Sequence, residues 1–211
     1  MWWWCMLKKL LMKLPTMKIR SAARMISDLH LHRIFMKLNF KRKRVLEVCV
    51  KHDYYRKRYM EEAIYKTLDV HEKYNPDYVG DVHELSKIFP KDTFHYVIAT
   101  EVFEHLYNPN VAAQEIHKVL EYGGKLIMST RFIEHLHDQP DYYRFTHHSL
   151  RYIFRNFSQV HIIPTGNRLV STWQINNING VQVVLNLFNY FISKITFNDR
   201  CPSGYVVEAI K

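Results

Sequence analysis

From residue 45 onward, short apolar segments alternate with segments of helical pattern. The segments "VLEVCV" (residues 45–50) and "FHYVIAT" (residues 94–100) are almost wholly apolar, as strands buried on both faces of a sheet are. Strands that alternate with helices at this spacing predict a parallel sheet with helices on both faces. The predicted fold class is therefore α/β, with one doubly wound sheet.

The remaining elements follow from turn residues and apolar periodicity. The helix that begins at Asn108-Pro109 is predicted to end at Gly123-Gly124, and Thr146 is a candidate N-cap for the next helix. Further strands are expected at residues 64–70, within 75–82, and at 125–130, 159–164 and 204–210. Further helices are expected at residues 21–38, 54–63 and 174–196.

The chain has 211 residues, of which 47% are hydrophobic and 24% charged, a composition that fits a globular domain and excludes a disordered one. Its net charge of +10 is concentrated near the N-terminus. Residues 1–44 hold twelve Lys or Arg and a single acid, Asp28, whereas the remainder holds 18 basic and 19 acidic residues. A basic arm of this kind can meet phosphate, RNA or an anionic membrane, or it can be the solvated face of a helix.

Residues 1–20 are interpreted as a basic, aromatic N-terminal extension, and residues 21–211 as one domain. The apolar run at the start spans seven residues, far fewer than the roughly 20 that cross a bilayer. Its basic residues follow the apolar run, the reverse of a secretory signal. Three Trp beside Lys8 and Lys9 could rest in a membrane interface, and a disordered extension or a partner-binding one remains equally open.

The three cysteines lie at positions 5, 49 and 201 and form no CxxC pair. An odd number without metal-ligand spacing argues against a disulfide framework and for a reducing compartment. The expected location is the cytoplasm, with peripheral membrane contact through residues 1–20 left open. The oligomeric state is not predicted.

Six segments in order resemble the class I S-adenosylmethionine-dependent methyltransferases, in particular the small single-domain branch of the methyltransferase type 11 kind. The resemblance runs from about Val45 to the C-terminus. The segments are "VLEVCVKHDYY", "TLDV", "YVGDVHELS", "FHYVIATEVFEHLYNP", "EIHKVLEYGGKLIMST" and "HDQPDYYRFTHHSLRYIF". It implies a Rossmann-like, seven-stranded sheet, mostly parallel with an antiparallel last strand, and S-adenosylmethionine as cofactor.

The resemblance also implies roles for residues at the carboxyl ends of the strands, where ligands bind in such sheets. By position, Asp69 would bind the ribose hydroxyls, Asp81 would accept from the adenine amino group, and the backbone N–H of Val82 would donate to the adenine. The methionine end would be lined by Thr100 and Glu101, and the loop or the cofactor's amino group would be reached by Glu47.

The loop after the first strand departs from the family pattern. Cys49, Lys51 and Asp53 stand where the family has glycine, which tolerates positive φ and lets the backbone approach a ligand. Their side chains should crowd the methionine moiety or push the loop outward, although Lys51 could pair with a carboxylate. Either a rebuilt loop binds the cofactor, with Cys49 and Lys51 among the contacts, or binding is lost.

Transfer to a hydroxyl requires a base, which we expect on the loop after the fifth strand. His137 is the candidate, because a neutral imidazole accepts a proton near pH 7, and Asp138 could orient it or act alone. A divalent metal held by His135, His137 and Asp138 is an alternative without a strong ligand signature, so no metal site is predicted. His105 is expected to fix a turn by a hydrogen bond.

The function expected from these residues is O-methylation of a carbohydrate or other small polar hydroxyl compound. One alternative is a catalytically inactive methyltransferase-like module that binds a partner or a glycan. A second is an RNA methyltransferase with the basic arm as an electrostatic contact, which the neutral charge of the body disfavours.

Overall fold

A computed structural model describes residues 22–49, 54–176 and 200–211. The helices are α2 (Ala22–Phe35), α3 (Tyr54–Tyr59), α4 (Leu85–Ile88), α5 (Pro109–Val119), α6 (His147–Ile153) and α7 (Arg168–Asn176). The strands are β1 (Arg44–Val48), β2 (Ile64–Asp69), β3 (Tyr78–Val79), β4 (Phe94–Thr100), β5 (Leu120–Arg131), β6 (Gln159–Thr165) and β7 (Gly204–Ile210). Three 3-10 helices, η1 (Glu72–Tyr74), η2 (Val82–Glu84) and η3 (Phe103–His105), follow β2, β3 and β4.

The described strands form one seven-stranded sheet in the order β3-β2-β1-β4-β5-β7-β6. The pairs from β3 to β5 are parallel, and β7 runs antiparallel to both β5 and β6. The predicted Rossmann-like sheet with an antiparallel last strand is therefore confirmed. The strand order reverses direction between β1 and β4, which is where such sheets bind ligands.

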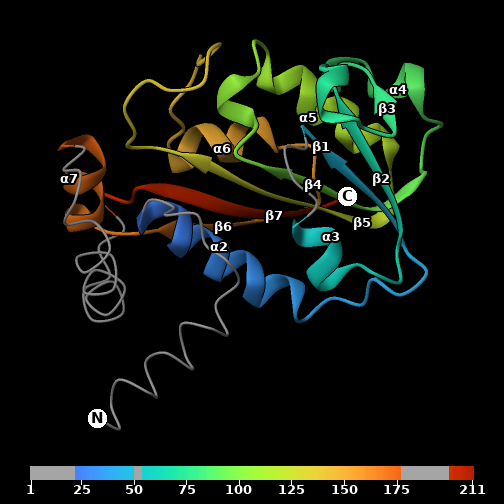
Figure 1. Ribbon diagram of the computed structural model, residues 1–211, viewed down its shortest axis with the longest axis horizontal. Helices are drawn as coiled ribbons and strands as arrows, with labels where there is room; N and C mark the ends of the chain where they lie inside the picture. The colour runs from blue at the N-terminus through green and yellow to red at the C-terminus, as the bar shows by residue number, and fades with distance from the viewer. Residues whose placement is uncertain (1–21, 50–53, 177–199) are drawn as a thin grey trace, which may run out of the picture.

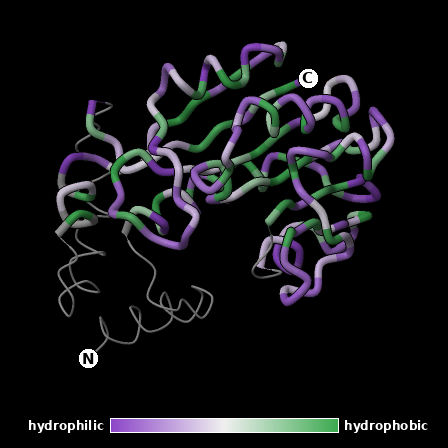
Figure 2. The backbone as a smooth tube through the Cα atoms, turned by 90° about the horizontal axis from the view of Figure 1, so that it is seen from above, coloured by the Kyte–Doolittle hydropathy of each residue, from purple (hydrophilic) through white to green (hydrophobic). Residues whose placement is uncertain are grey.

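Apolar side chains alternate between the two faces of the sheet, because successive strand residues point in opposite directions. Leu46 and Val48 of β1 pack with α4, α5 and α6, whereas Val45 packs with α2 and α3. The same alternation continues through the central strands, with Val97, Leu126 and Val207 on the first face and Ile98, Ile127 and Val206 on the second. Figure 1 shows the helices on both sides, and Figure 2 shows hydrophobic residues along the strands between them.

Two helix starts match the sequence signals closely. The Asn108 side chain accepts a hydrogen bond from the Val111 N–H at 3.3 Å, with Pro109 in the first turn of α5. Thr146 caps α6 in a reciprocal arrangement with Ser149, whose hydroxyl accepts from the Thr146 N–H at 2.9 Å. These caps fix where the chain enters each helix on the α5–α6 face.

The predicted end of α5 at Gly123-Gly124 is wrong. The helix ends at Val119, and β5 begins at Leu120, which pairs with Phe94 of β4. The two glycines serve an irregularity within β5 instead. Gly123 has a φ of +75°, and a Cβ on Gly124 would lie 2.8 Å from the Glu121 carbonyl oxygen.

Other differences are small or fall outside the described residues. Helix α3 ends at Tyr59, earlier than the predicted residue 63. Of the apolar stretch at 174–196, only the part that belongs to α7 is described. The extension at residues 1–20 also lies outside. None of the described helices has both the length and the apolar character that a bilayer crossing needs.

Candidate active site at the carboxyl edge of the sheet

The candidate residues from sequence gather at one edge of the sheet. Three of them lie at the carboxyl ends of the adjacent strands β1, β2 and β4: Glu47, Asp69 and Thr100. Thr100 also pairs with Ser129 of β5. Asp81 directly precedes η2, and Glu101 directly follows β4. Parallel strands end on the same side, so the topology places these five residues around the reversal point between β1 and β4.

The backbone is strained on both sides of this reversal point. Cys49, which directly follows β1, has a φ of 59°, and Glu101, which directly follows β4, has a φ of 57°. Residues other than glycine rarely adopt this left-handed conformation, and such strain gathers at functional sites. Cys49 therefore reproduces the backbone conformation for which glycine is suited, and its N–H donates to the Leu68 carbonyl at 2.7 Å. The predicted contacts of Lys51 and Asp53 lie outside the described residues.

Asp69 and Asp81 each close a turn through their own Oδ1 atom. Asp69 Oδ1 accepts the His71 N–H at 2.8 Å, and Asp81 Oδ1 accepts the His83 N–H at 2.9 Å and contacts His83 Nδ1 at 2.5 Å. Within the described chain, Oδ2 is the oxygen of each carboxylate that a ligand would use. Val82 opens η2, and the first N–H groups of a helix have no partner within it.

Glu101 belongs to a buried network of ion pairs and hydrogen bonds. Its carboxylate contacts Arg131 Nε, accepts the Ser129 hydroxyl at 2.6 Å and lies 3.7 Å from Arg24 Nη1. Burial opposes ionisation of Glu101, but the positive charges of Arg131 and Arg24 outweigh it and lower the pKa. Glu101 is thus an ionised group that ties β4 to β5 and α2 beside the methionine end expected from sequence.

Glu104 was not identified from the sequence, yet it is fully buried. Its Oε2 accepts the Thr130 hydroxyl at 2.8 Å, and Oε1 has no hydrogen-bond partner among the described residues. Burial, with the neighbouring charge of Glu101, raises the pKa of Glu104 to about 8. The spacing of "TEVFEH" offered a signal, because it places Glu101 and Glu104 three residues apart in one tight turn.

The loop after β5 is held in shape by Arg144. This guanidinium binds both oxygens of Asp141, at 2.5 and 2.7 Å, and donates to the carbonyls of Glu134 at 3.2 Å and His135 at 2.9 Å. The Arg144 hydrogen bonds lower the pKa of Asp141 to about 2. Asp141 and Arg144 therefore fix the course of residues 134–144 over the sheet edge.

His137 is half-buried on this loop, with its backbone and ring both oriented. Its N–H donates to Asp141 Oδ2 at 3.0 Å, and its ring Nδ1 lies 3.2 Å from the His135 carbonyl oxygen. The described carboxylate against His137 is thus Asp141, whereas Asp138 is exposed with a φ of 40°. The sequence argument gave Asp138 the role of orienting His137 or of acting alone, and this stays a prediction.

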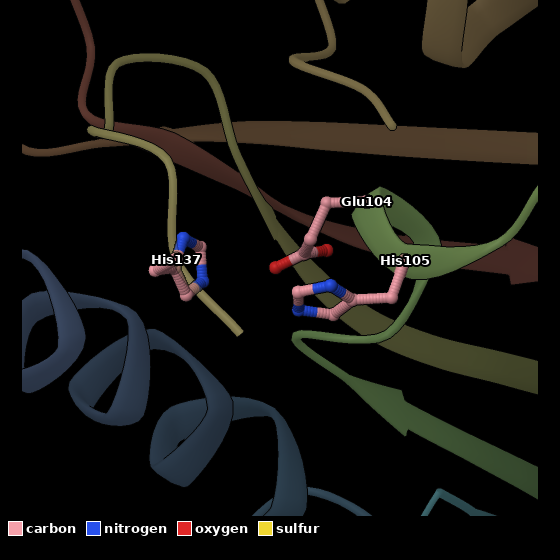
Figure 3. Close-up of side chains that lie close together, drawn as sticks. All are labelled: Glu104, His105 and His137. Atoms are coloured by element: carbon pink, nitrogen blue, oxygen red, sulfur yellow. The ribbon is translucent and has the colours of Figure 1, made fainter. Parts of the chain in front are cut away.

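His105 faces His137 from the turn after β4. Its Nδ1 donates to the Pro140 carbonyl at 2.7 Å, so its hydrogen bond joins η3 to the loop after β5 and not the residues of its own turn. The two imidazole ring centres are 5.3 Å apart. Figure 3 shows the Glu104 carboxylate and the His105 ring, both from η3, directed toward His137. The structure therefore brings Glu104, His105 and His137 together and leaves Asp69 and Asp81 on the β2–η2 side.

Residues 49–128 match a family model described as a methyltransferase domain. No curated protein matches the sequence. Among solved structures, the chain resembles a SAM-dependent methyltransferase from Archaeoglobus fulgidus at 18% identity and a TM-score of 0.59, covering 88% of this chain and 94% of that one. A methyltransferase structure from Bacillus halodurans has 14% identity and a TM-score of 0.57, with 88% and 99% covered.

Phosphoethanolamine N-methyltransferase 2 of Haemonchus contortus, in complex with S-adenosyl-L-methionine, has 15% identity and a TM-score of 0.56. The match covers 87% of this chain and 51% of that one, so the chain spans about half of that enzyme. The matched methyltransferase domain, the strand order and the position of the acidic residues at the sheet edge agree. The chain therefore has the fold of these methyltransferases, and residues 49–128 match a methyltransferase domain.

Proposed function

We propose that this chain is an S-adenosylmethionine-dependent methyltransferase and that it methylates a hydroxyl group of a small polar acceptor, with a carbohydrate as the favoured class. The observation that carries the proposal is the orientation of His137. A carbonyl oxygen accepts hydrogen bonds only, so the His137 Nδ1 beside the His135 carbonyl bears the proton. The Nε2 of the neutral ring then has the lone pair that can accept a hydroxyl proton.

The residues of the β2–η2 side fit the cofactor by their chemistry. Carboxylates suit ribose hydroxyls and an adenine amino group, and Asp69 and Asp81 stand at the two turns where the family places these contacts. The backbone N–H of Val82 supplies a donor for the adenine ring. Thr100 and Glu47 are the candidates for the methionine end. When bound, the cofactor supplies an electrophilic methyl group.

Exposed aromatic rings on the loop that also carries His137 support a sugar acceptor. Tyr142 and Tyr143 are exposed by 54% and 38%, and their N–H groups donate to the Glu104 carbonyl at 2.8 and 3.1 Å. These bonds hold the loop that carries both rings against η3, on the same side as His137. Exposed aromatic faces held in place can pack against the apolar face of a sugar ring.

His137→Ala tests the proposed base. We expect turnover on a hydroxyl acceptor to fall about 100-fold or more, because general base catalysis contributes roughly 10²–10⁴-fold, while cofactor affinity stays within about twofold. The assay measures S-adenosylhomocysteine release with a panel of monosaccharides, small alcohols and, as a competing class, small amines. The control is His135→Ala on the same loop, which removes an exposed ring that contacts Glu134 but keeps the carbonyl that Arg144 and His137 use.

Unchanged turnover in His137→Ala would exclude this imidazole as the base. Methylation confined to the amines would overturn the hydroxyl acceptor while leaving the methyltransferase intact.

A further inference from the structure

We propose that Glu104, His105 and His137 form a binding site for a divalent transition-metal ion on the acceptor side of the methyltransferase site. One ligand atom from each residue lies within 4.8 Å of the others. An ion with ligands at about 2.1 Å brings its ligand atoms to within roughly 4 Å of one another, so small side-chain rotations complete the site. This set shares only His137 with the metal ligands considered from the sequence.

Both imidazoles are prepared for a metal by their other nitrogen. His105 Nδ1 donates to the Pro140 carbonyl at 2.7 Å, and His137 Nδ1 lies 3.2 Å from the His135 carbonyl. Metal-binding histidines characteristically donate their second N–H in this way, which fixes the tautomer and the ring orientation. The lone pair of each neutral ring is then on Nε2.

Glu104 supplies an oxygen that the described protein does not otherwise use. The side chain is fully buried, its Oε2 is anchored by the Thr130 hydroxyl at 2.8 Å, and its Oε1 has no hydrogen-bond partner within the described ranges. A buried carboxylate oxygen without a partner is costly unless a proton or a cation satisfies it. The close-up shows this carboxylate directed toward the two rings (Figure 3).

Nearby charges allow a cation at this point. Two guanidiniums interact electrostatically with Glu104: Arg131 is paired with Glu101, and Arg144 is paired with Asp141 through two hydrogen bonds. Each positive charge next to the site thus has its own carboxylate. A bound cation would complete the pairing for Glu104.

The ligand set selects the class of ion. Two imidazoles and one carboxylate suit Zn²⁺, Fe²⁺, Co²⁺ or Mn²⁺, whereas Mg²⁺ and Ca²⁺ prefer oxygen ligands throughout. Three protein ligands also leave coordination positions open for a substrate oxygen.

The inference rests on the proposed function for its role. An acceptor hydroxyl bound to the metal has a lowered pKa. Its O–H bond breaks and the proton passes to water, and an O–C bond forms as the S–CH₃ bond of the donor breaks. In the metal-loaded protein His137 is a ligand that activates the hydroxyl through the metal, instead of taking the proton directly.

Titration of the chelator-stripped, full-length protein with Co²⁺ tests the site, read by calorimetry and by the visible absorption of imidazole-bound cobalt. We expect one Co²⁺ per chain, and an affinity at least about 100-fold higher than that for Mg²⁺. Glu104→Gln, His105→Ala and His137→Ala should each lower Co²⁺ affinity roughly 100-fold, whereas His135→Ala should change it less than about threefold. Circular dichroism checks that each variant folds. Because His137 is half-buried on a loop, we expect its substitution to disturb the fold least.

Co²⁺ binding that is absent, that equals Mg²⁺ binding, or that survives both histidine substitutions would overturn the metal site. Methyl transfer to a hydroxyl in the presence of chelator, with no Co²⁺ binding, removes the metal and leaves the proposed function standing. Tight Co²⁺ binding without methylation of any hydroxyl acceptor leaves the metal site and removes the proposed acceptor.

Discussion

The two halves of the sheet edge are built differently. On the cofactor side, Asp69 and Asp81 each bond to a backbone N–H two residues away. On the acceptor side, Glu104 and the adjoining Glu101 of the expected methionine end are held by Ser129, Thr130 and Arg131, residues 26 to 30 positions later in the chain. The first half is therefore an array of local turns, and the second is a buried polar network that exists only once β4 and β5 have paired.

This difference predicts where substitutions harm the fold and where they harm only binding. A substitution in a buried network lowers the free energy of unfolding, because it leaves a buried charge without its partner. Turns whose carboxylates bond only to a neighbouring backbone N–H lose ligand contacts first. The following predictions separate these two consequences, from the largest expected effect to the smallest.

Arg131→Met should have the largest effect on stability. It leaves the buried Glu101 carboxylate without its main partner, and breaking such a pair typically costs about 3–5 kcal/mol in the free energy of unfolding. Denaturant unfolding measures the change. The matched control is Lys125→Met, which breaks the more exposed pair with Glu208 and should cost about 1 kcal/mol or less. Equal losses in the two variants would contradict a special acceptor-side network.

Glu104 should make stability depend on pH in metal-free buffer. Its pKa in the folded protein is raised from about 4.5 to about 8, so the folded state binds the proton more tightly than the unfolded chain does. The stabilisation is complete below about pH 4.5 and is lost as the pH rises through 8. Relative to Glu104→Gln, the wild type should lose about 4 kcal/mol between pH 5 and 9. Parallel pH profiles would show that folding does not raise the pKa of Glu104.

Cys49 should show a smaller effect that depends on side-chain shape. A β-branched residue tolerates the observed φ of 59° poorly. Cys49→Ala should therefore lower the free energy of unfolding by less than about 1 kcal/mol, and Cys49→Val should lower it by about 1–2 kcal/mol more than that. Thermal and denaturant unfolding of both variants provide the comparison. A Val variant as stable as the Ala variant would remove the argument that backbone strain is stored after β1.

The same contrast explains how much the sequence could predict. The sheet, its antiparallel last strand, the caps at Asn108 and Thr146, and the placement of Asp69 and Asp81 at turns depend on local patterns. The sequence missed the end of α5 because Gly123-Gly124 resembles a helix terminus, whereas the pairing of Leu120 with Phe94 favours strand. Strand pairing with β4 therefore decides the end of the helix, against the local signal of the two glycines.

The acceptor side could be predicted only in part. His137 was identified by its position in the loop after β5. The carboxylate that accepts from its backbone N–H is that of Asp141, which Arg144 holds in place by hydrogen bonds. The buried role of Glu104 depends on Thr130 and on the closure of the sheet over η3. No periodicity in the sequence signals a contact of that kind.

The central claim is that Asp69 and Asp81 still hold the adenosine of S-adenosylmethionine although Cys49 replaces a glycine. Calorimetric titration with S-adenosylmethionine tests it most directly, in the wild type, in Asp69→Asn, in Asp81→Asn and in the control Asp77→Asn, whose carboxylate binds Thr67. We expect one cofactor per wild-type chain, about 10- to 100-fold weaker binding in the first two variants, and near wild-type affinity in the control. A folded wild type that releases no heat at millimolar cofactor, or equal affinities in all four proteins, would contradict the account.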